Sequence, residues 1–504
     1  MTSFARTPTS VSLRVSSYDN FQGIDTSRDA RSMETGSDQH FVLLKNCHAD
    51  WRGQITRDPG ATKLAGDFPV RHIDFASSTD PVWVEQDDAG MNLVSLSGAR
   101  VDAAFTGECS ATSTVFGKRV IIACRGSAPY VYQDGAFSQN LSPAMNLILM
   151  PDFLSTVSRR LAVAGVPGQE TVVHLSRVDN ADVMPDDEEP GDTNVLRAGT
   201  IDIANLTGNA DFITGLGSFE NNRLLIFTQD RAITYIIDAD IDEWKLDDTT
   251  NIQIGCISHN TIHQAGNDVL FCSRSGIHSI KRSQDNGILA YSKTLSEKIA
   301  DLYTYLVSTV EDPQTITATF DPDKGQYHVF FPTTYGPSRR LTLTLNPERG
   351  EEAEPKFSTA DFLTARCGAF LGGNLLFGTP GGVYKILKAT EEVEGAITPE
   401  AEIVFPYFWH GSLTENKDIH SLIIQAIGKG TITLTATRDD GAVFDAMTME
   451  VEGSSDDSLF VDVPLSTQYE RPFQHRYLSA QYRLAITGGA GLLRLVGFAV
   501  LIRK

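Results

Sequence analysis

The segment Asn267-Asp-Val-Leu-Phe-Cys-Ser-Arg-Ser-Gly-Ile-His-Ser-Ile280 carries the pattern from which the fold can be inferred. A turn residue opens it, an apolar run follows, and a polar turn separates that run from a second one. Short apolar runs bounded by Gly, Asn and Ser are typical of neighbouring β-strands. The same unit recurs along the chain, at Arg119–Tyr132, Arg160–His174, Arg223–Ile236, Asn267–Ile280, Gln326–Leu345 and Asn374–Leu387.

The spacing of these units predicts a β-propeller. Their first residues are separated by 41, 63, 44, 59 and 48 residues, and propeller blades repeat at about 40–50 residues. An earlier pair of runs, at His72–Val84 and Met91–Leu96, is a candidate for one more unit. The expectation is an all-β propeller of six or seven degenerate blades. A pair of β-sandwiches is the structural alternative.

Strand patterns dominate the rest of the chain, and helical patterns are scarce. Ile432–Thr437 alternates apolar and hydroxyl side chains, which suits a half-buried strand. The best helical pattern is Ser296–Leu306, where Ser296 can cap the helix and apolar residues follow with helical spacing. One or two short helices are therefore expected.

Composition divides the chain into four parts. Residues 1–40 are polar, with few apolar anchors, and suggest an extended N-terminal arm. The propeller is assigned to residues 41–390. Residues 391–402 are expected to form a linker, because the segment is acidic and contains Pro399. Residues 403–504 are expected to form a C-terminal β-sandwich.

Charge excludes several classes of function. The chain has 504 residues, with 42 Lys and Arg against 64 Asp and Glu, so its formal net charge is −22. A protein that binds nucleic acid through its phosphates needs a cluster of basic residues, so this charge weighs against such a function.

No run of about 18 apolar residues is present, so no membrane span is expected. The first residues show no secretory signal pattern.

The six cysteines include no CxxC pair, and several lie within apolar runs, so buried free thiols are expected. His259 and His263 are four residues apart, a spacing that could bind a metal on a helix, but ordinary loop or strand histidines are the preferred interpretation. Asp238–Asp242 and Asp321–Gly325 resemble fragments of calcium loops without completing one. We therefore expect no metal and no cofactor.

Two charged segments are candidates for interactions. Asp186, Asp187, Glu188 and Glu189 form the centre of an acidic run, a candidate DNA-repelling or partner-binding loop. Residues 471–504 contain six basic residues and no acidic one. Four of those basic residues, Arg471, Arg476, Arg483 and Arg494, are the candidate subunit or partner interface. Outward-facing strand residues are an equally good interpretation.

Three stretches in order resemble one protein family. The first is Leu44–Gly60, where Asn46 precedes a turn containing Arg57, Pro59 and Gly60. The second is Ser158–Gly165, followed by Val173–Ser176 and the acidic run. The third is Gly255–Ile262 with Gly266–Ile280. Together they resemble bacteriophage tail nozzle (tail tubular) and packaged-DNA stabilisation proteins over roughly residues 40–390.

This resemblance implies a structural virion protein rather than an enzyme. Such proteins form a homohexameric ring below the portal and adaptor of short-tailed phages. The ring extends the DNA channel, retains packaged DNA and docks fibres or tip proteins. It implies assembly in the host cytoplasm, a location in the virion tail, and passage of double-stranded DNA without sequence-specific binding. The alternative is a propeller polysaccharide hydrolase, with a phage tail depolymerase as its phage form. Glycoside hydrolysis uses a pair of carboxylates that need only converge in space, so the sequence leaves this alternative open.

Overall fold

The computed structural model divides the chain into two compact units. One unit comprises Met1–Gly60, Lys356–Ala360 and Leu387–Lys504, and the other comprises Ala61–Pro355 and Asp361–Ile386. The structure describes all residues except 1–12, 19–20, 28–38, 51–52, 89, 104, 106–109, 125, 140, 142–143, 146–148, 208–210, 248–251, 267, 281–293, 334–336, 346–353, 389–390, 392, 409–416, 439–440, 444–445, 453–466, 478, 489–492 and 504.

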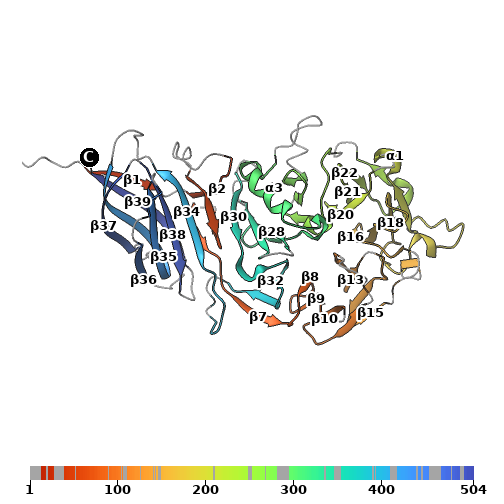
Figure 1. Cartoon of the computed structure of the whole chain (residues 1–504). Coiled ribbons are helices and arrows are strands. Elements are labelled where there is room, and N and C mark those ends of the chain that lie inside the picture. Colours follow the sequence, from red (N-terminus) through yellow and green to blue (C-terminus); the bar gives the residue numbers. More distant parts are fainter. Residues whose placement is uncertain are drawn as a thin grey trace, which may run out of the picture. The chain divides into compact units, whose positions relative to one another are not determined.

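The unit Ala61–Pro355 with Asp361–Ile386 is a β-propeller. In Figure 1 its colours pass from orange through yellow and green to cyan around the ring. The first blade contains β8 (Val70–Ser77), β9 (Asp80–Gln86), β10 (Met91–Ser95) and β11 (Arg100–Ala103). The second contains β12 (Thr112–Phe116), β13 (Arg119–Ala123), β14 (Tyr130–Gln133) and β15 (Ala136–Ser138). The third contains β16 (Phe153–Val157), β17 (Arg160–Ala164), β18 (Val172–Leu175) and β19 (Gly199–Asp202).

The remaining blades complete the ring. The fourth and fifth are β20 (Ile213–Phe219), β21 (Arg223–Thr228), β22 (Ala232–Ile236) and β23 (Lys245–Leu246); and β24 (His263–Ala265), β25 (Asp268–Cys272) and β26 (Ile277–Ser279). The sixth is the meander β27 (Thr317–Asp321), β28 (Gln326–Phe331) and β29 (Arg339–Thr344). The last contains β31 (Cys367–Leu371), β32 (Asn374–Thr379) and β33 (Gly382–Ile386), with β7 (Ala61–Ala65) as its outer strand.

The first strands of successive blades line the axis of the ring. Contacts run in order through β8, β12, β16, β20, β24, β27 and β31, and β31 returns to β8. In the described part of the chain, the β27–β29 meander occupies the sixth position, and the other six blades are separate sheets. The antiparallel pairing of β7 with β33 closes the ring with a strand from the start of the unit.

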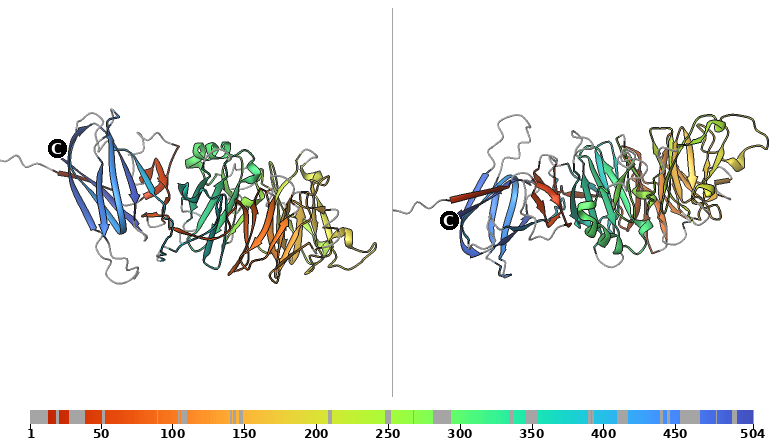
Figure 2. Two further views of the ribbon diagram at one scale, coloured as in Figure 1. Left: turned by 60° about the horizontal axis from the view of Figure 1, so that its bottom comes forward. Right: turned by 90° about the horizontal axis from the view of Figure 1, so that it is seen from above.

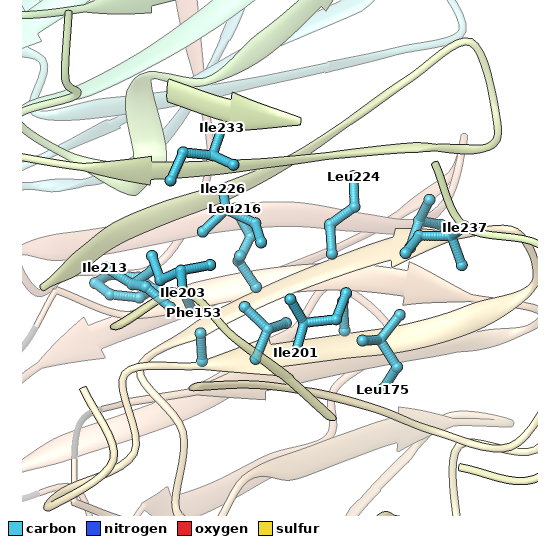
Figure 3. Close-up of a cluster of buried hydrophobic side chains, with 14 residues drawn as sticks. Phe153, Leu175, Ile201, Ile203, Ile213, Leu216, Leu224, Ile226, Ile233 and Ile237 are labelled. Carbon is cyan, nitrogen blue, oxygen red and sulfur yellow. The ribbon is translucent and has the colours of Figure 1, made fainter. Parts of the chain in front are cut away.

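Apolar faces hold neighbouring blades together. Between the third and fourth blades lies a cluster of buried side chains that includes Leu175, Ile201, Leu216, Leu224 and Ile226. Figure 3 shows the residues of one blade facing those of the next across this interface. Leu224 and Ile226 are fully buried. Each blade thus covers its neighbour, which is the physical reason for closing the ring.

The predicted fold class is therefore confirmed. Each repeated unit found in the sequence contains the second and third strands of one blade, as Arg223–Ile236 does for β21 and β22. The earlier pair, His72–Val84 and Met91–Leu96, falls on β8, β9 and β10. The expected short helix is present as α3 (Ala300–Ser308), preceded by the 3-10 turn η6 (Glu297–Ile299), and a further single turn, α1, spans Ala204–Thr207.

The other unit is also built from strands, and Figure 2 shows it in red and blue. Its strands are β1 (Leu13–Tyr18), β2 (Phe21–Ile24), β3 (Gln39–Phe41), β4 (Leu43–Lys45), β5 (Cys47–Ala49), β6 (Ile55–Arg57), β30 (Lys356–Ala360), β34 (Ala401–Phe408), β35 (Lys417–Arg438), β36 (Met447–Glu452), β37 (Thr467–Tyr477), β38 (Ala480–Thr487) and β39 (Leu493–Arg503). The long strand β35 pairs with β37 and β39 along its first half and with β36 and β38 along its second half.

The boundaries differ from those inferred from the sequence. Three stretches assigned to the propeller form strands of the other unit, namely β4 (Leu43–Lys45), β5 (Cys47–Ala49) and β6 (Ile55–Arg57). The expected arm also contains β1, which pairs with β39, and β2, whose Phe21 is fully buried against Phe41. The sequence did not predict these strands because the segment contains few apolar residues. Two short strands need only a few buried side chains to be held in a sheet.

The expectation of free thiols holds for Cys47, Cys256, Cys272 and Cys367, which are buried and unbridged. It is wrong for Cys124, which is disulfide-bonded. Cys109 lies outside the described residues.

Candidate functional site

The axis of the propeller contains a pocket of about 280 Å³. Its wall comes from the inner strands β8, β12, β24, β27 and β31 and from the 3-10 turn η5 (His259–Thr261). The polar residues His72, Asp74, Ser113, Asn260 and His263 are among those that line it. Because five blades and a turn contribute, the pocket exists only when the ring is closed.

The turn η5 crosses the axis beside this pocket. It precedes the fifth blade, yet the Asn260 side-chain amide donates to the carbonyl of Ala111 and to Ser110 Oγ, each at 2.9 Å, just before the second blade. The His259 ring also lies 5.4 Å from the Phe153 ring at the start of the third blade. These contacts join opposite sides of the ring, so η5 obstructs the axis of the propeller.

A chain of hydrogen bonds connects the first two blades within the pocket. Ser113 Oγ lies 2.6 Å from Asp74 Oδ2 and 2.7 Å from His72 Nε2. A carboxylate only accepts, so the Ser113 hydroxyl donates to Asp74 and accepts from the His72 Nε2–H. This order differs from that of an activated serine, in which the histidine accepts the hydroxyl proton.

The two histidines of the fifth blade are held by backbone groups. The Leu216 N–H donates to His259 Nδ1 at 3.1 Å, and His263 Nε2 donates to the Ala318 carbonyl at 2.8 Å. Burial, together with the neighbouring His72 and His263, lowers the pKa of His259 to about 3. Burial also lowers the pKa of His72 and of His263. All three rings are therefore neutral at pH 7.

These bonds favour the ordinary-histidine interpretation of His259 and His263. Each ring has a nitrogen engaged with the backbone of a neighbouring blade. Across the residues that the structure describes, no three His, Cys, Asp or Glu side chains are grouped so as to hold a metal ion. In the same part of the chain, no helix is long and apolar enough to cross a membrane.

The candidate acidic loop is largely engaged within the third blade. Asp187 accepts from the backbone of Met184 and of Ala144, and Glu188 accepts from Ala198 N–H at 2.8 Å. Arg177 lies 3.8 Å from Glu188. Asp186 and Glu189 are exposed. The sequence showed a run without basic residues, but the fold brings a basic residue to it.

The candidate arginines lie on three strands of the other unit. Arg471 and Arg476 are in β37, and their side chains lie outside the described residues. Arg483 is exposed on β38 and pairs with Glu402 at 2.8 Å. Arg494 is half-buried on β39. Whether they form an interface stays a prediction.

The pocket was not predicted from the sequence. Asp74 and Ser113 are 39 residues apart, and Asn260 lies 149 residues from Ala111. Only the closure of the ring brings them together. The one available signal was the occurrence of polar residues in inner strands, as at His72 and Asp74 in β8. This signal could be used only once it was known which strand of each blade is the inner one.

Comparison with known proteins identifies no family, because neither a family model nor a curated protein matches the chain. Among solved structures, YCF48 from Cyanidioschyzon merolae matches with 14% identity and a TM-score of 0.36, covering 65% of this chain and 98% of that one. A protein of Bacteroides uniformis proposed to be a 6-phosphogluconolactonase matches with 15% identity and a TM-score of 0.36, covering 62% of this chain and 93% of that one.

Proposed function

We propose that this chain is a structural virion protein, a tail nozzle that forms a homohexameric ring and extends the DNA channel of a short-tailed phage. In this role it binds its own copies, an adaptor or portal complex, and fibre or tip proteins. It is not an enzyme. It is assembled in the host cytoplasm and works in the phage tail. The three sequence stretches that resemble nozzle proteins are the starting point for this proposal.

The distribution of charge is the observation that carries the proposal. The propeller unit holds 41 Asp and Glu against 24 Lys and Arg, a formal charge of −17. The other unit holds 23 acidic against 18 basic residues, a charge of −5. Each cation that contacts a phosphate adds affinity through counterion release, so a wall rich in acids lets a duplex slide. Repeated copies of this propeller would surround DNA with a repulsive field.

The obstructed axis of the propeller bears on where we propose that such a channel lies. Asn260 and His259 cross the ring from the fifth blade to the second and third. Since η5 obstructs the axis of each propeller, the DNA channel has to be formed between copies of the chain. The proposal therefore requires an assembly, which makes it testable in solution.

The pocket gives no specific support to the polysaccharide hydrolase. Glycoside hydrolysis normally requires two carboxyl groups at the scissile bond. Asp74 is the one carboxylate among the residues that line this pocket. Ser113 donates its hydrogen bond to Asp74 and not to a histidine, so the pocket lacks the serine–histidine pair of a hydrolase triad.

The solution mass of the purified chain tests the proposal. The expected result is a particle near six times 55.0 kDa with no hydrolysis of a polysaccharide panel. Replacing Arg471→Glu with Arg476→Glu is expected to weaken assembly if β37 lies in the subunit interface. Lys118→Glu with Lys245→Glu, at exposed propeller positions, is the control with the same charge change. A monomer that cleaves polysaccharide would overturn the proposal.

A further inference from the structure

The electrostatics of the central pocket are those of a single negative charge. Asp74 is its one carboxylate, and no Lys or Arg is among the lining residues. In the described part of the chain, Asp74 takes part in no ion pair. The lining histidines are neutral, as derived above. An uncompensated carboxylate in a partly enclosed site favours a cation as its partner.

The hydrogen-bonding groups of the pocket are mainly acceptors once internal bonds are assigned. His72 Nε2–H is used by Ser113, and His263 Nε2–H is used by Ala318. The Asn260 amide donates to Ser110 and Ala111. These donors of His72, His263 and Asn260 are thus already engaged with the protein.

The carboxylate keeps part of its accepting capacity. Asp74 Oδ1 accepts from the Phe75 N–H at 2.7 Å, and Oδ2 accepts from Ser113. A carboxylate offers about four acceptor positions, so about two remain. The Nε2–H tautomer of His72, fixed by Ser113, leaves its Nδ1 as a further acceptor. A ligand that fits has to bring hydrogen-bond donors.

We propose that this pocket binds a small organic cation through a primary ammonium group paired with Asp74. An ammonium group supplies three N–H donors and one positive charge, which match the acceptors and the carboxylate. Phe320 and Phe370 also line the pocket and suit a short alkyl chain. A volume of about 280 Å³ admits a ligand of a few carbon atoms rather than a polymer.

Other ligand classes fit less well. A phosphate or carboxylate would meet Asp74 with no cation beside it. A sugar needs several donors as well as acceptors around its hydroxyl groups, and the donors of His72, His263 and Asn260 are already engaged. A directly coordinated metal lacks a suitable ligand group among the described residues.

The test uses the purified full chain and three probes of similar size. Binding of n-butylammonium, tetramethylammonium and n-butanol is measured by titration calorimetry at pH 7. Saturable binding of n-butylammonium is expected, at least about tenfold tighter than either control, because tetramethylammonium has the charge without donors and butanol lacks the charge. Equal binding of the three probes, preferred binding of a neutral hexose, or no binding would overturn the proposal.

Two variants locate the ligand. Asp74→Asn is expected to weaken n-butylammonium binding at least about tenfold. Asp102→Asn, on the exposed outer strand of the same blade, is the matched control and should bind as the wild type does. An unchanged affinity in Asp74→Asn would refute the assignment.

A measurement on the wild type covers the case in which Asp74→Asn does not fold. In the ¹⁵N-histidine-labelled chain, n-butylammonium should shift the imidazole signals of His72, and His48 in the other unit should not respond. Absence of any shift at His72 would contradict the proposal. The nozzle proposal is judged by assembly mass, so failure of one does not imply failure of the other.

Discussion

At the scale of single residues, the axis of the propeller depends on histidines that must stay neutral. His259 Nδ1 accepts a backbone N–H, which it cannot do when protonated. The folded chain therefore binds this proton less readily than the unfolded chain does. The stability that His259 contributes is fully present above about pH 6.5 and is lost as the pH falls toward its folded pKa of about 3.

His259→Asn should reduce this dependence on pH, because an amide oxygen can accept from Leu216 without titrating. Between pH 7 and pH 5 the wild type is expected to lose about 2 kcal/mol more stability than the variant does. Denaturant unfolding of the full chain at both pH values measures this difference. Identical pH profiles for the two proteins would show that His259 does not supply the effect.

Gly255 is a second residue whose identity the fold requires. A Cβ at this position would lie 2.0 Å from the Gln229 carbonyl oxygen and 2.3 Å from that of Thr228. Both are backbone atoms and cannot move aside cheaply. Gly255→Ala is expected to cost about 3 kcal/mol or more. Gly381→Ala, where the nearest atoms are 3.9 Å from the Cβ, is the control. Equal melting temperatures for the two variants would contradict the requirement for glycine at position 255.

At the scale of elements, stability comes from blade-to-blade burial. Leu224 on β21 is fully buried in the interface shown in Figure 3, and Leu371 at the end of β31 is 40% exposed. Leu224→Ala is expected to lower the free energy of unfolding by about 2–5 kcal/mol, and Leu371→Ala by less than about 1 kcal/mol. Thermal or urea unfolding of both variants checks this. Similar losses would mean that this interface does not carry the stability.

The middle strands of the blades could be predicted from the sequence because their signal is local. Arg223–Ile236 contains two apolar runs and a turn, and any such unit becomes a hairpin whatever surrounds it. The closing strand β7 carries no such signal, because Ala61–Ala65 is defined by its partner β33. The strand β30 likewise carries no local signal, because its five residues are defined by pairing with β4 in the unit that is not the propeller.

The candidate site lay beyond sequence reasoning for the same reason. His72, Ser113 and Asn260 lie on different blades, and each looks like an ordinary polar residue in its own segment. Their common position results from a ring closure that no local pattern specifies. In contrast, charge can be counted without a fold, so the acid excess was visible at once.

At the scale of the whole molecule, the chain passes between its two units repeatedly. The propeller begins after Gly60, is interrupted by β30, and ends at Ile386. Both ends of the chain belong to the unit that is not the propeller, so removal of one terminus should affect that unit more. Deletion of residues 1–38 removes β1 and the buried Phe21 and Ile24.

We expect this deletion to lower the melting temperature of the unit that contains β39 while the propeller transition stays unchanged. The reason is that β1 pairs with β39 of that unit, whereas the propeller begins along the chain with β7, which pairs with β33. Differential scanning calorimetry resolves the two transitions. A single unchanged transition would show that the arm contributes no core, and loss of both would show that the units fold together.

The most direct test of the nozzle account is an electron microscopy image of the assembled protein. The account predicts a six-fold ring with an open central channel between copies that is wide enough for duplex DNA, and propellers whose own axes are closed. A ring without a channel, or an assembly in which DNA would have to pass through the propellers, would contradict it.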